Sequence, residues 1–142
     1  MHTIHQILEH KGRDIHWVAP DRTVYDAIRH MAELGIGALL VMREGKPLGM
    51  LSERDYARKV ILEGRRSRDT RVEEIMSAPL ITIEGRATAD AGLALMTQNK
   101  IRHLPVVDDG ELIGLVSIGD LVDAVIDDQQ RLIDQLEHYV TG

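Results

Sequence analysis

The alternation of hydrophobic and polar positions predicts one order of elements twice along the chain. In the first half, an extended segment at 16–19 precedes a stretch, 24–34, in which apolar residues recur at helical spacing. Two short apolar runs, 38–42 and 48–51, then flank a glutamate-glycine pair. Runs of this kind around a turn predict a β-hairpin, and apolar residues three or four apart predict an amphipathic helix. A second helix is expected to start at Glu53.

Capping residues mark the ends of the first predicted helix. Thr23, followed three residues later by Asp26, is typical of an N-cap, and Gly35 is typical of a helix end. The second half shows the same order, beginning with an extended segment at 80–83 and a helix with an apolar stripe from Ala91 to Met96 and a stop near Asn99. Hairpin runs at 104–107 and 112–116 then flank Asp109-Gly110, and a further helix is expected from Ile118.

A self-match accounts for this similarity between the halves. Shifting the sequence by 65 positions aligns 16–60 with 81–125 without a gap, and ten of the 45 aligned positions are identical. Roughly three identities would be expected by chance, so the match indicates a duplication. The expected fold is therefore mixed α/β (α+β), with tandem β-α-β-β-α repeats. Because one unit of about 60 residues buries little area, the two are expected to pack around a pseudo-twofold axis.

The boundaries expected from this pattern are a first repeat at 10–68, a connector at 69–77 and a second repeat at 78–140. Within the connector, 70–76 has the pattern of a short helix ending before Pro79. The C-terminal helix is expected to be long, with one apolar stripe running from Leu121 to Val140. Such a stripe needs a partner, either an N-terminal helix at 3–10 or a second subunit.

The amino-acid composition limits the kinds of core and binding site that the protein can form. The 142 residues are 44% hydrophobic and include no Phe and no Cys, so the core must come from Leu, Ile, Val, Ala and Met. Aromatic platforms for stacking nucleic-acid bases are not expected. Disulfides and thiolate sites are excluded, which fits a reducing compartment. With no signal peptide and no apolar run approaching 18 residues, a cytoplasmic location away from the membrane is expected.

Charged residues are distributed unevenly along the chain. A net charge of −6 disfavours general nucleic-acid binding, yet seven Lys and Arg against three acids lie between Arg54 and Arg71. Nine acids against one Arg lie between Asp108 and Glu137. The basic segment has two interpretations, a solvated helix face or part of a pocket for a small anion.

The sharpest local pattern is Gly-hydrophobic-hydrophobic-Ser-x-x-Asp, which ends at Asp55 in the first repeat and at Asp120 in the second. Ser-x-x-Asp where a strand meets a helix is nearly a capping box, so helix capping is one interpretation of Ser52 and Ser117. Nucleotide binding is the other. The first turn of a helix offers free amides to a phosphate, Ser can donate to it, and Asp can accept hydrogen bonds from two ribose hydroxyls.

The repeat and its two signatures resemble the CBS domain pair, named for cystathionine β-synthase. The resemblance covers about 10 to 140 and is greatest for stand-alone bacterial proteins and similar plant organellar proteins, through Ser-Glu-Arg-Asp-Tyr-Ala-Arg-Lys-Val (52–60) and Lys-Ile-Arg-His-Leu-Pro-Val-Val-Asp (100–108). It implies a regulatory homodimer that binds AMP, ADP or ATP, with NAD or S-adenosylmethionine as further ligands of the family.

The resemblance also implies site residues. Asp55 and Asp120 match the ribose-binding Asp, and Ser52 and Ser117 match the hydroxyl residue beside it. Arg102 and His103 match positions that face the phosphates, although both also have an interpretation as plain surface residues. The full expected set is Ser52, Asp55, Ser117, Asp120, Arg102, His103, Pro105, Thr82, Gly37, Ala38, Arg54 and Arg58.

The two copies differ within that set. Gly37 and Ala38 replace the Arg-His pair in the first copy, so Arg54 and Arg58 are the phosphate candidates there. Trp17 stands where the second copy has Thr82. The site with Asp120, Arg102 and His103 is therefore expected to be the better nucleotide site.

Catalysis is not expected. The sequence has no phosphate-binding loop of the P-loop or Rossmann type, no metal-ligand spacing among its histidines and no local Ser-His-acid arrangement. The leading hypothesis is a non-enzymatic nucleotide sensor that signals through a change in packing. The alternative is an interaction adaptor that docks a partner enzyme through its acidic C-terminal helix; resemblance to the plant proteins points to a redox partner such as a thioredoxin.

Overall fold

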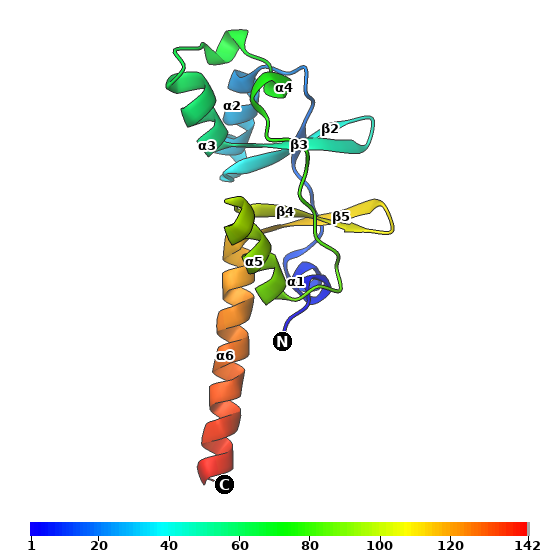
Figure 1. Ribbon diagram of the computed structural model, residues 1–142, viewed down its shortest axis with the longest axis vertical. Coiled ribbons are helices and arrows are strands. Elements are labelled where there is room, and N and C mark those ends of the chain that lie inside the picture. Colours follow the sequence, from blue (N-terminus) through cyan, green and yellow to red (C-terminus); the bar gives the residue numbers. More distant parts are fainter. Residues whose placement is uncertain (142) are drawn as a thin grey trace. The chain divides into compact units, whose positions relative to one another are not determined.

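The computed structural model describes residues 1–141 and divides into two compact units (Figure 1). The first-repeat unit is residues 15–80. The second-repeat unit combines residues 1–14 with the described residues from Ile81 onward. The N-terminal helix thus belongs to the second-repeat unit, although the first repeat follows it in the chain. The boundaries 10–68, 69–77 and 78–140 stay a prediction.

The first-repeat unit has the predicted β-α-β-β-α order. Its sheet has the strand order β1-β2-β3, with β1 parallel to β2 and β2 antiparallel to β3. The predicted second helix becomes a short α-helix followed by a π-helical turn, and the helical part of the connector is one turn long. The elements are β1 (Trp17–Val18), α2 (Val24–Leu34), β2 (Ala38–Arg43), β3 (Lys46–Ser52), α3 (Glu53–Tyr56), η1 (Ala57–Ile61), η2 (Ser67–Asp69) and α4 (Val72–Ile75).

The second-repeat unit repeats this order with one difference. The extended segment predicted at 80–83 contributes a single parallel bridge between Ile83 and Val106 rather than a strand. The chain leaves the sheet there because it turns at once, and the Gly85 amide donates to Oδ1 of Asp108. The elements are α1 (Ile4–Lys11), α5 (Ala89–Asn99), β4 (His103–Asp108), β5 (Glu111–Ser117) and α6 (Ile118–Thr141).

The hairpins match between the repeats. Glu44-Gly45 and Asp109-Gly110 form the turns, and all four residues have positive φ, as a two-residue type I′ turn requires. Each hairpin also has the same register irregularity, after Val41 in the first repeat and after Val106 in the second. The duplication therefore extends to the irregular details of the strand pairing.

The capping residues act as predicted. Oγ1 of Thr23 accepts the Asp26 amide at 3.1 Å at the start of α2. Gly35 ends the helix in the left-handed region, with φ of 67°. In the second repeat Thr88 caps α5, and Lys100 takes the left-handed position that follows Asn99.

Each unit has its own core of aliphatic side chains and Met. In the first-repeat unit the buried core is Val18, Val24, Ala27, Met31, Leu39, Val41, Leu51, Val60, Val72 and Ile75. In the second-repeat unit α1 is part of the core, which consists of Ile4, Ile7, Leu8, Ile83, Ala89, Met96, Leu104, Val106, Val116, Leu121 and Ala124. No aromatic side chain is among these buried residues, and the partly buried Tyr56 packs against the first-repeat core.

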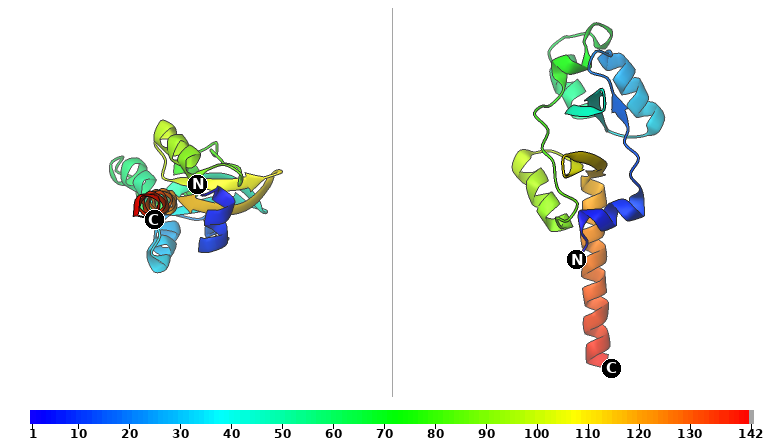
Figure 2. Two further views of the ribbon diagram at one scale, coloured as in Figure 1. Left: turned by 90° about the horizontal axis from the view of Figure 1, so that it is seen from below. Right: turned by 90° about the vertical axis from the view of Figure 1, so that its right-hand side faces the viewer.

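The C-terminal helix α6 continues past the rest of its unit (Figure 1). Only its first half packs on that unit, where Leu121 and Ala124 are buried and α1 and α5 lie against it (Figure 2). The N-terminal helix therefore covers part of the predicted stripe at most. From Ile126 to Val140 the large apolar side chains are exposed within the described chain.

Candidate functional site

The two Ser-x-x-Asp segments form equivalent strand-to-helix junctions. In the second repeat, the Ser117 amide donates to Oδ2 of Asp120 at 2.8 Å, and the Asp120 amide donates to Oγ of Ser117 at 3.2 Å. Ser52 and Asp55 make the same reciprocal pair at 3.0 and 3.1 Å. Both segments thus cap a helix, and whether they also bind a ligand depends on which carboxylate oxygens stay accessible.

Asp120 has one such oxygen. Its Oδ2 accepts from the Ser117 amide and also from Nζ of Lys11 at 2.6 Å. Among the residues that the structure describes, Oδ1 has no hydrogen-bond partner within the protein, and the side chain is 24% exposed. The carboxylate is thus fixed through one oxygen and presents the other.

Lys11 reaches this junction from the last turn of α1. Its ammonium also donates to the carbonyl oxygen of Leu115 at 3.0 Å, which fixes its position beside β5. The pKa of Asp120 is lowered: burial on its own would raise it, but the hydrogen bonds from Lys11 and Ser117 outweigh burial. Asp120 is therefore a carboxylate near neutral pH, as an acceptor for two hydroxyl groups must be.

His103 lies opposite Ser117 in the pairing of β4 with β5. Burial lowers the pKa of its imidazole, and the positive charge of Lys11 lowers it further, while Asp120 acts in the opposite direction. The ring is therefore neutral near pH 7. It supplies a hydrogen-bonding group at the junction, and the positive charges there belong to Lys11 and Arg102.

The backbone before each hairpin is tied to the following helix in the same way in both repeats. The Ile118 amide donates to the carbonyl oxygen of Arg102 at 2.8 Å, and the Glu53 amide donates to that of Gly37 at 3.0 Å. The side chain of Arg102 is thus carried on backbone bonded to the first turn of α6. Gly37 and Ala38, at the equivalent positions, bring no charged side chain to the first junction.

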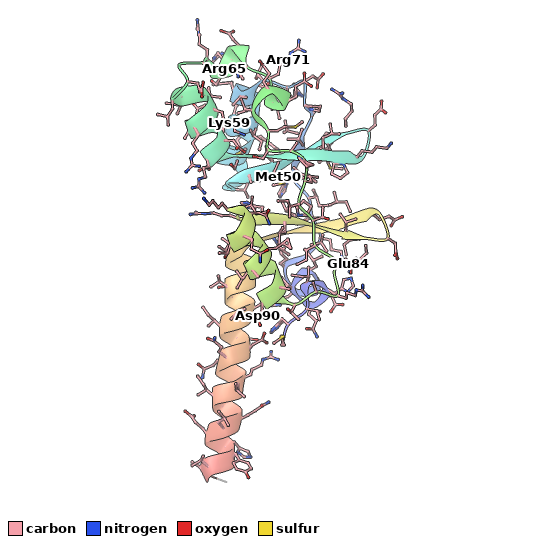
Figure 3. The ribbon with its side chains drawn as sticks, in the orientation of Figure 1. Met50, Lys59, Arg65, Arg71, Glu84 and Asp90 are labelled. Carbon is pink, nitrogen blue, oxygen red and sulfur yellow. The ribbon has the colours of Figure 1, made fainter. Side chains whose placement is uncertain are left out.

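In the first repeat, both carboxylate oxygens of Asp55 already have partners within the protein. Lys59 lies 3.2 Å from its Oδ1, and Oγ of Ser77 donates to the same oxygen at 3.1 Å, while Ser52 occupies Oδ2. Its side chain is only 13% exposed. Figure 3 labels Lys59, whose ammonium also donates to the Ile75 carbonyl. A ribose at this junction would have to displace an existing contact.

The remaining expected residues are dispersed. Arg54 and Arg58 are exposed on α3 and η1, and neither has an ion pair within residues 1–141. Thr82 is exposed just before the bridge at Ile83. Pro105 is buried in β4, where its carbonyl oxygen accepts the Ile83 amide. Pro105 therefore shapes the strand from within.

A separate shallow groove lies on the first-repeat unit. Trp17, which is 52% exposed, borders it with side chains of α2. Two of its arginines are paired within the helix region, Arg22 with Asp26 and Arg29 with Glu33. Neither Ser52 nor Asp55 lines this groove, so it is not the predicted site.

Sequence reasoning missed the cations that contact the two carboxylates. Lys59 follows Asp55 by four residues on a helix, a spacing that predicts an ion pair. Lys11 is 109 residues from Asp120, and no local pattern could have connected them. Within residues 1–141, no three His, Asp or Glu side chains are placed to hold a metal ion, and no helix is long and apolar enough to cross a membrane.

Comparison with known proteins finds the same family in a family model and in a curated relative. The family model described as CBS domain matches residues 9–62 and 72–127. The CBS domain-containing protein CBSX3, mitochondrial, of Arabidopsis thaliana is 39% identical over 149 residues, covering 99% of this chain and 72% of that protein.

Two solved structures are similar as well. A protein with CBS domains from Burkholderia ambifaria MC40-6 is 54% identical, with a TM-score of 0.87 over 90% of this chain and 96% of that one. The CBS-domain containing protein ATU1752 from Agrobacterium tumefaciens is 33% identical, with a TM-score of 0.83 over 87% of this chain and 98% of that one.

Proposed function

The chain belongs to the CBS domain family, and from this premise we propose that it is a regulatory module that binds an adenosine nucleotide at the junction of β5 and α6. The ligand is AMP, ADP or ATP, with NAD or S-adenosylmethionine as alternatives. The observation that carries this proposal is the state of Asp120. Its carboxylate is ionised, held through Oδ2 by Ser117 and Lys11, and accessible through Oδ1.

The proposed contacts follow from the chemistry of that junction. Oδ1 of Asp120 accepts a hydroxyl of the ribose. Lys11 and Arg102 provide positive charge for the phosphates, and the amides in the first turn of α6 favour an anion. His103, being neutral, contributes a hydrogen bond. The Asp55 junction, with both oxygens occupied, is the weaker site.

The proposed output is a change in protein contacts rather than a chemical reaction. CBS domain pairs are generally regulatory, and the junction has no nucleophile paired with a base in the described residues. Bound nucleotide would act on α6 through its first turn, because Asp120 lies in that turn and Ser117 directly precedes it. A ligand shifts the packing only as far as it binds the two arrangements with different affinity.

Thermal unfolding with and without 1 mM nucleotide tests the site. The wild type is expected to show a rise in melting temperature with the right nucleotide, and Asp120→Ala to show none, each compared with its own ligand-free value. Asp123→Ala is the matched control, because this exposed acid of α6 has no ion pair in the described structure. Equal shifts in Asp120→Ala and wild type would place the nucleotide elsewhere.

An interaction adaptor is the second candidate function. The acidic α6, exposed along its second half, favours it. In that case the chain regulates a partner enzyme, such as a redox protein of the thioredoxin type, without control by nucleotide. The two functions differ in their response to Asp120→Ala: the sensor loses nucleotide binding, whereas the adaptor keeps its hold on the partner.

Two further properties belong to the proposal. A homodimer is expected from the uncovered stripe of α6, and sedimentation at micromolar concentration should give about twice 15.9 kDa. A cytoplasmic location is expected from the absence of cysteine and of a candidate membrane span in the described residues. The name of the Arabidopsis relative makes a mitochondrial location the alternative, and cell fractionation separates the two.

A further inference from the structure

One side of α6 carries a row of apolar side chains that the described chain leaves largely uncovered. Its centre line is Val122, Gln129 and Leu136, which are seven residues apart. Ile126, Ile133 and Val140 flank the centre line on one side, and Val125, Leu132 and Tyr139 flank it on the other. We call these nine residues the α6 stripe. A seven-residue apolar repeat is the pattern with which helices pair in a coiled coil.

The stripe is exposed except at Val125, which is partly buried against the core of its own unit. Val122 is 39% exposed at the start, Ile126 is 58%, Leu136 is 57%, and Val140 is 82%. The side of α6 that packs on its own unit is different, because it carries the buried Leu121 and Ala124 and the partly buried Asp128. At about 100° per residue, that side is about a third of a turn from the centre line of the stripe. The unit therefore supports α6 and covers part of Val125, while the other eight stripe residues stay exposed.

The charges of α6 lie away from the stripe. Arg131 pairs with Asp127 at 3.1 Å, and Gln130 donates to Asp134 at 3.0 Å, both within the helix. Asp128 is held by His2 at 2.6 Å on the side that faces the unit. The nine stripe positions carry no charge, so two copies of α6 can meet along the stripe without bringing like charges together, despite the acidic character of the helix.

Gln129 selects the partner and the register. It is the one amide among the apolar side chains of the stripe. In a parallel pair in register, Gln129 meets Gln129 of the second copy, and each amide has a hydrogen-bond partner. A shifted pair, or an apolar helix of another protein, would leave the amide against aliphatic side chains without that bond. An antiparallel pair centred on Gln129 would keep the bond, but it would set the exposed second half of each helix against the first half of the other, where Val125 is partly buried on the core of its own unit.

We propose that a second copy of the chain packs against the α6 stripe in parallel and in register at Gln129. This rests on the homodimer of the proposed function and adds its contact surface, orientation and register. Because Ser117 and Asp120 lie at the start of α6, the pairing places the two Asp120 junctions at the same end of the paired helices. Nucleotide bound there would act directly on the helix pair.

Disulfide cross-linking of the full chain tests the arrangement, since the sequence contains no cysteine and each introduced thiol is unique. Under mild oxidation, Gln129→Cys is expected to give at least about tenfold more covalent dimer than the control Arg131→Cys, which lies on the charged side. Equal yields from the two variants would overturn the proposal.

A mixed experiment distinguishes the antiparallel arrangement. Val122→Cys and Leu136→Cys are combined, one of them carrying a tag so that the mixed dimer has its own mass. Parallel pairing predicts same-variant dimers, because each thiol meets its own equivalent. Predominance of the mixed dimer would show an antiparallel pair and contradict the proposal.

Failure of this inference is distinguishable from failure of the proposed function. Cross-linking through Gln129→Cys with no nucleotide binding would support the pairing of α6 and contradict the proposed nucleotide sensor. The opposite result is nucleotide binding by a species that sediments near 15.9 kDa, with no excess cross-linking at Gln129. That result would support the nucleotide sensor and overturn the pairing of α6.

Discussion

The ammonium of Lys11 lies 2.6 Å from Oδ2 of Asp120, so the end of the N-terminal helix is joined to the first turn of the C-terminal helix. Ser117 occupies the same oxygen from the other side. The helix before the first repeat thus completes the candidate site of the second.

Replacing Lys11 by Met should weaken nucleotide binding by about tenfold, because it removes a positive charge that fixes the Asp120 carboxylate. Loss of this partly exposed ion pair should lower the free energy of unfolding by only about 0.5–1 kcal/mol. Calorimetric titration and urea unfolding measure the two effects. Lys46→Met, at the tip of the first hairpin and without an ion pair in the described residues, should change neither. Unchanged affinity in Lys11→Met would exclude Lys11 from the site.

Asp128 should make stability depend on acid pH. Burial on its own would raise the pKa of this carboxyl, but hydrogen bonds from the His2 amide and ring outweigh it and lower the pKa. The unfolded chain therefore binds the proton first as pH falls. The stabilisation is complete above the unfolded value of about 4 and is lost as pH falls through the folded pKa.

Urea unfolding of Asp128→Asn between pH 2 and 6 checks this prediction. The variant should lose less stability than the wild type over the acid range, because it has no carboxyl left to protonate at that position. Asp123→Asn, an exposed acid on the same helix, should follow the wild-type curve. Parallel curves for wild type and Asp128→Asn would show that the His2 contact does not persist in solution.

Gly49 should resist substitution by any residue with a Cβ atom. A Cβ there would lie 2.7 Å from the Ser77 carbonyl oxygen, in a segment bonded to Met50 in both directions; Met50 is labelled in Figure 3. Gly49→Ala should therefore lower the free energy of unfolding by about 1–3 kcal/mol. Gly37→Ala is the control, since the same atom would meet nothing within 4 Å. Similar unfolding midpoints for both variants would contradict the close approach.

Most of the fold could be predicted because its signals are local and occur twice. The spacing of apolar residues, the caps at Thr23 and Gly35 and the turn at Asp109-Gly110 each act over a few residues, and the structure confirms them. The second-repeat sheet is the exception. Its first strand shrinks to the bridge at Ile83, because Gly85 is bonded to Asp108, which is distant in the sequence.

The candidate site could be predicted only as far as its local motif. Ser117 and Asp120 are three residues apart, so their reciprocal hydrogen bonds follow from the sequence. The contacts that distinguish the two junctions are tertiary: Lys11 reaches Asp120 across most of the chain, and Ser77 reaches Asp55 from the connector. The charge state of His103 also depends on burial, which no local pattern gives.

If Asp120 anchors an adenosine nucleotide, isothermal titration calorimetry will detect both the binding and its dependence on this carboxylate. Wild-type protein is titrated with AMP, ADP, ATP, NAD, NADH and S-adenosylmethionine, and Asp120→Ala with whichever binds. We expect a dissociation constant well below about 1 mM for at least one adenine nucleotide and a loss of at least about tenfold in affinity in the variant. No binding below about 1 mM by any of the six, or equal affinity in wild type and Asp120→Ala, would contradict it.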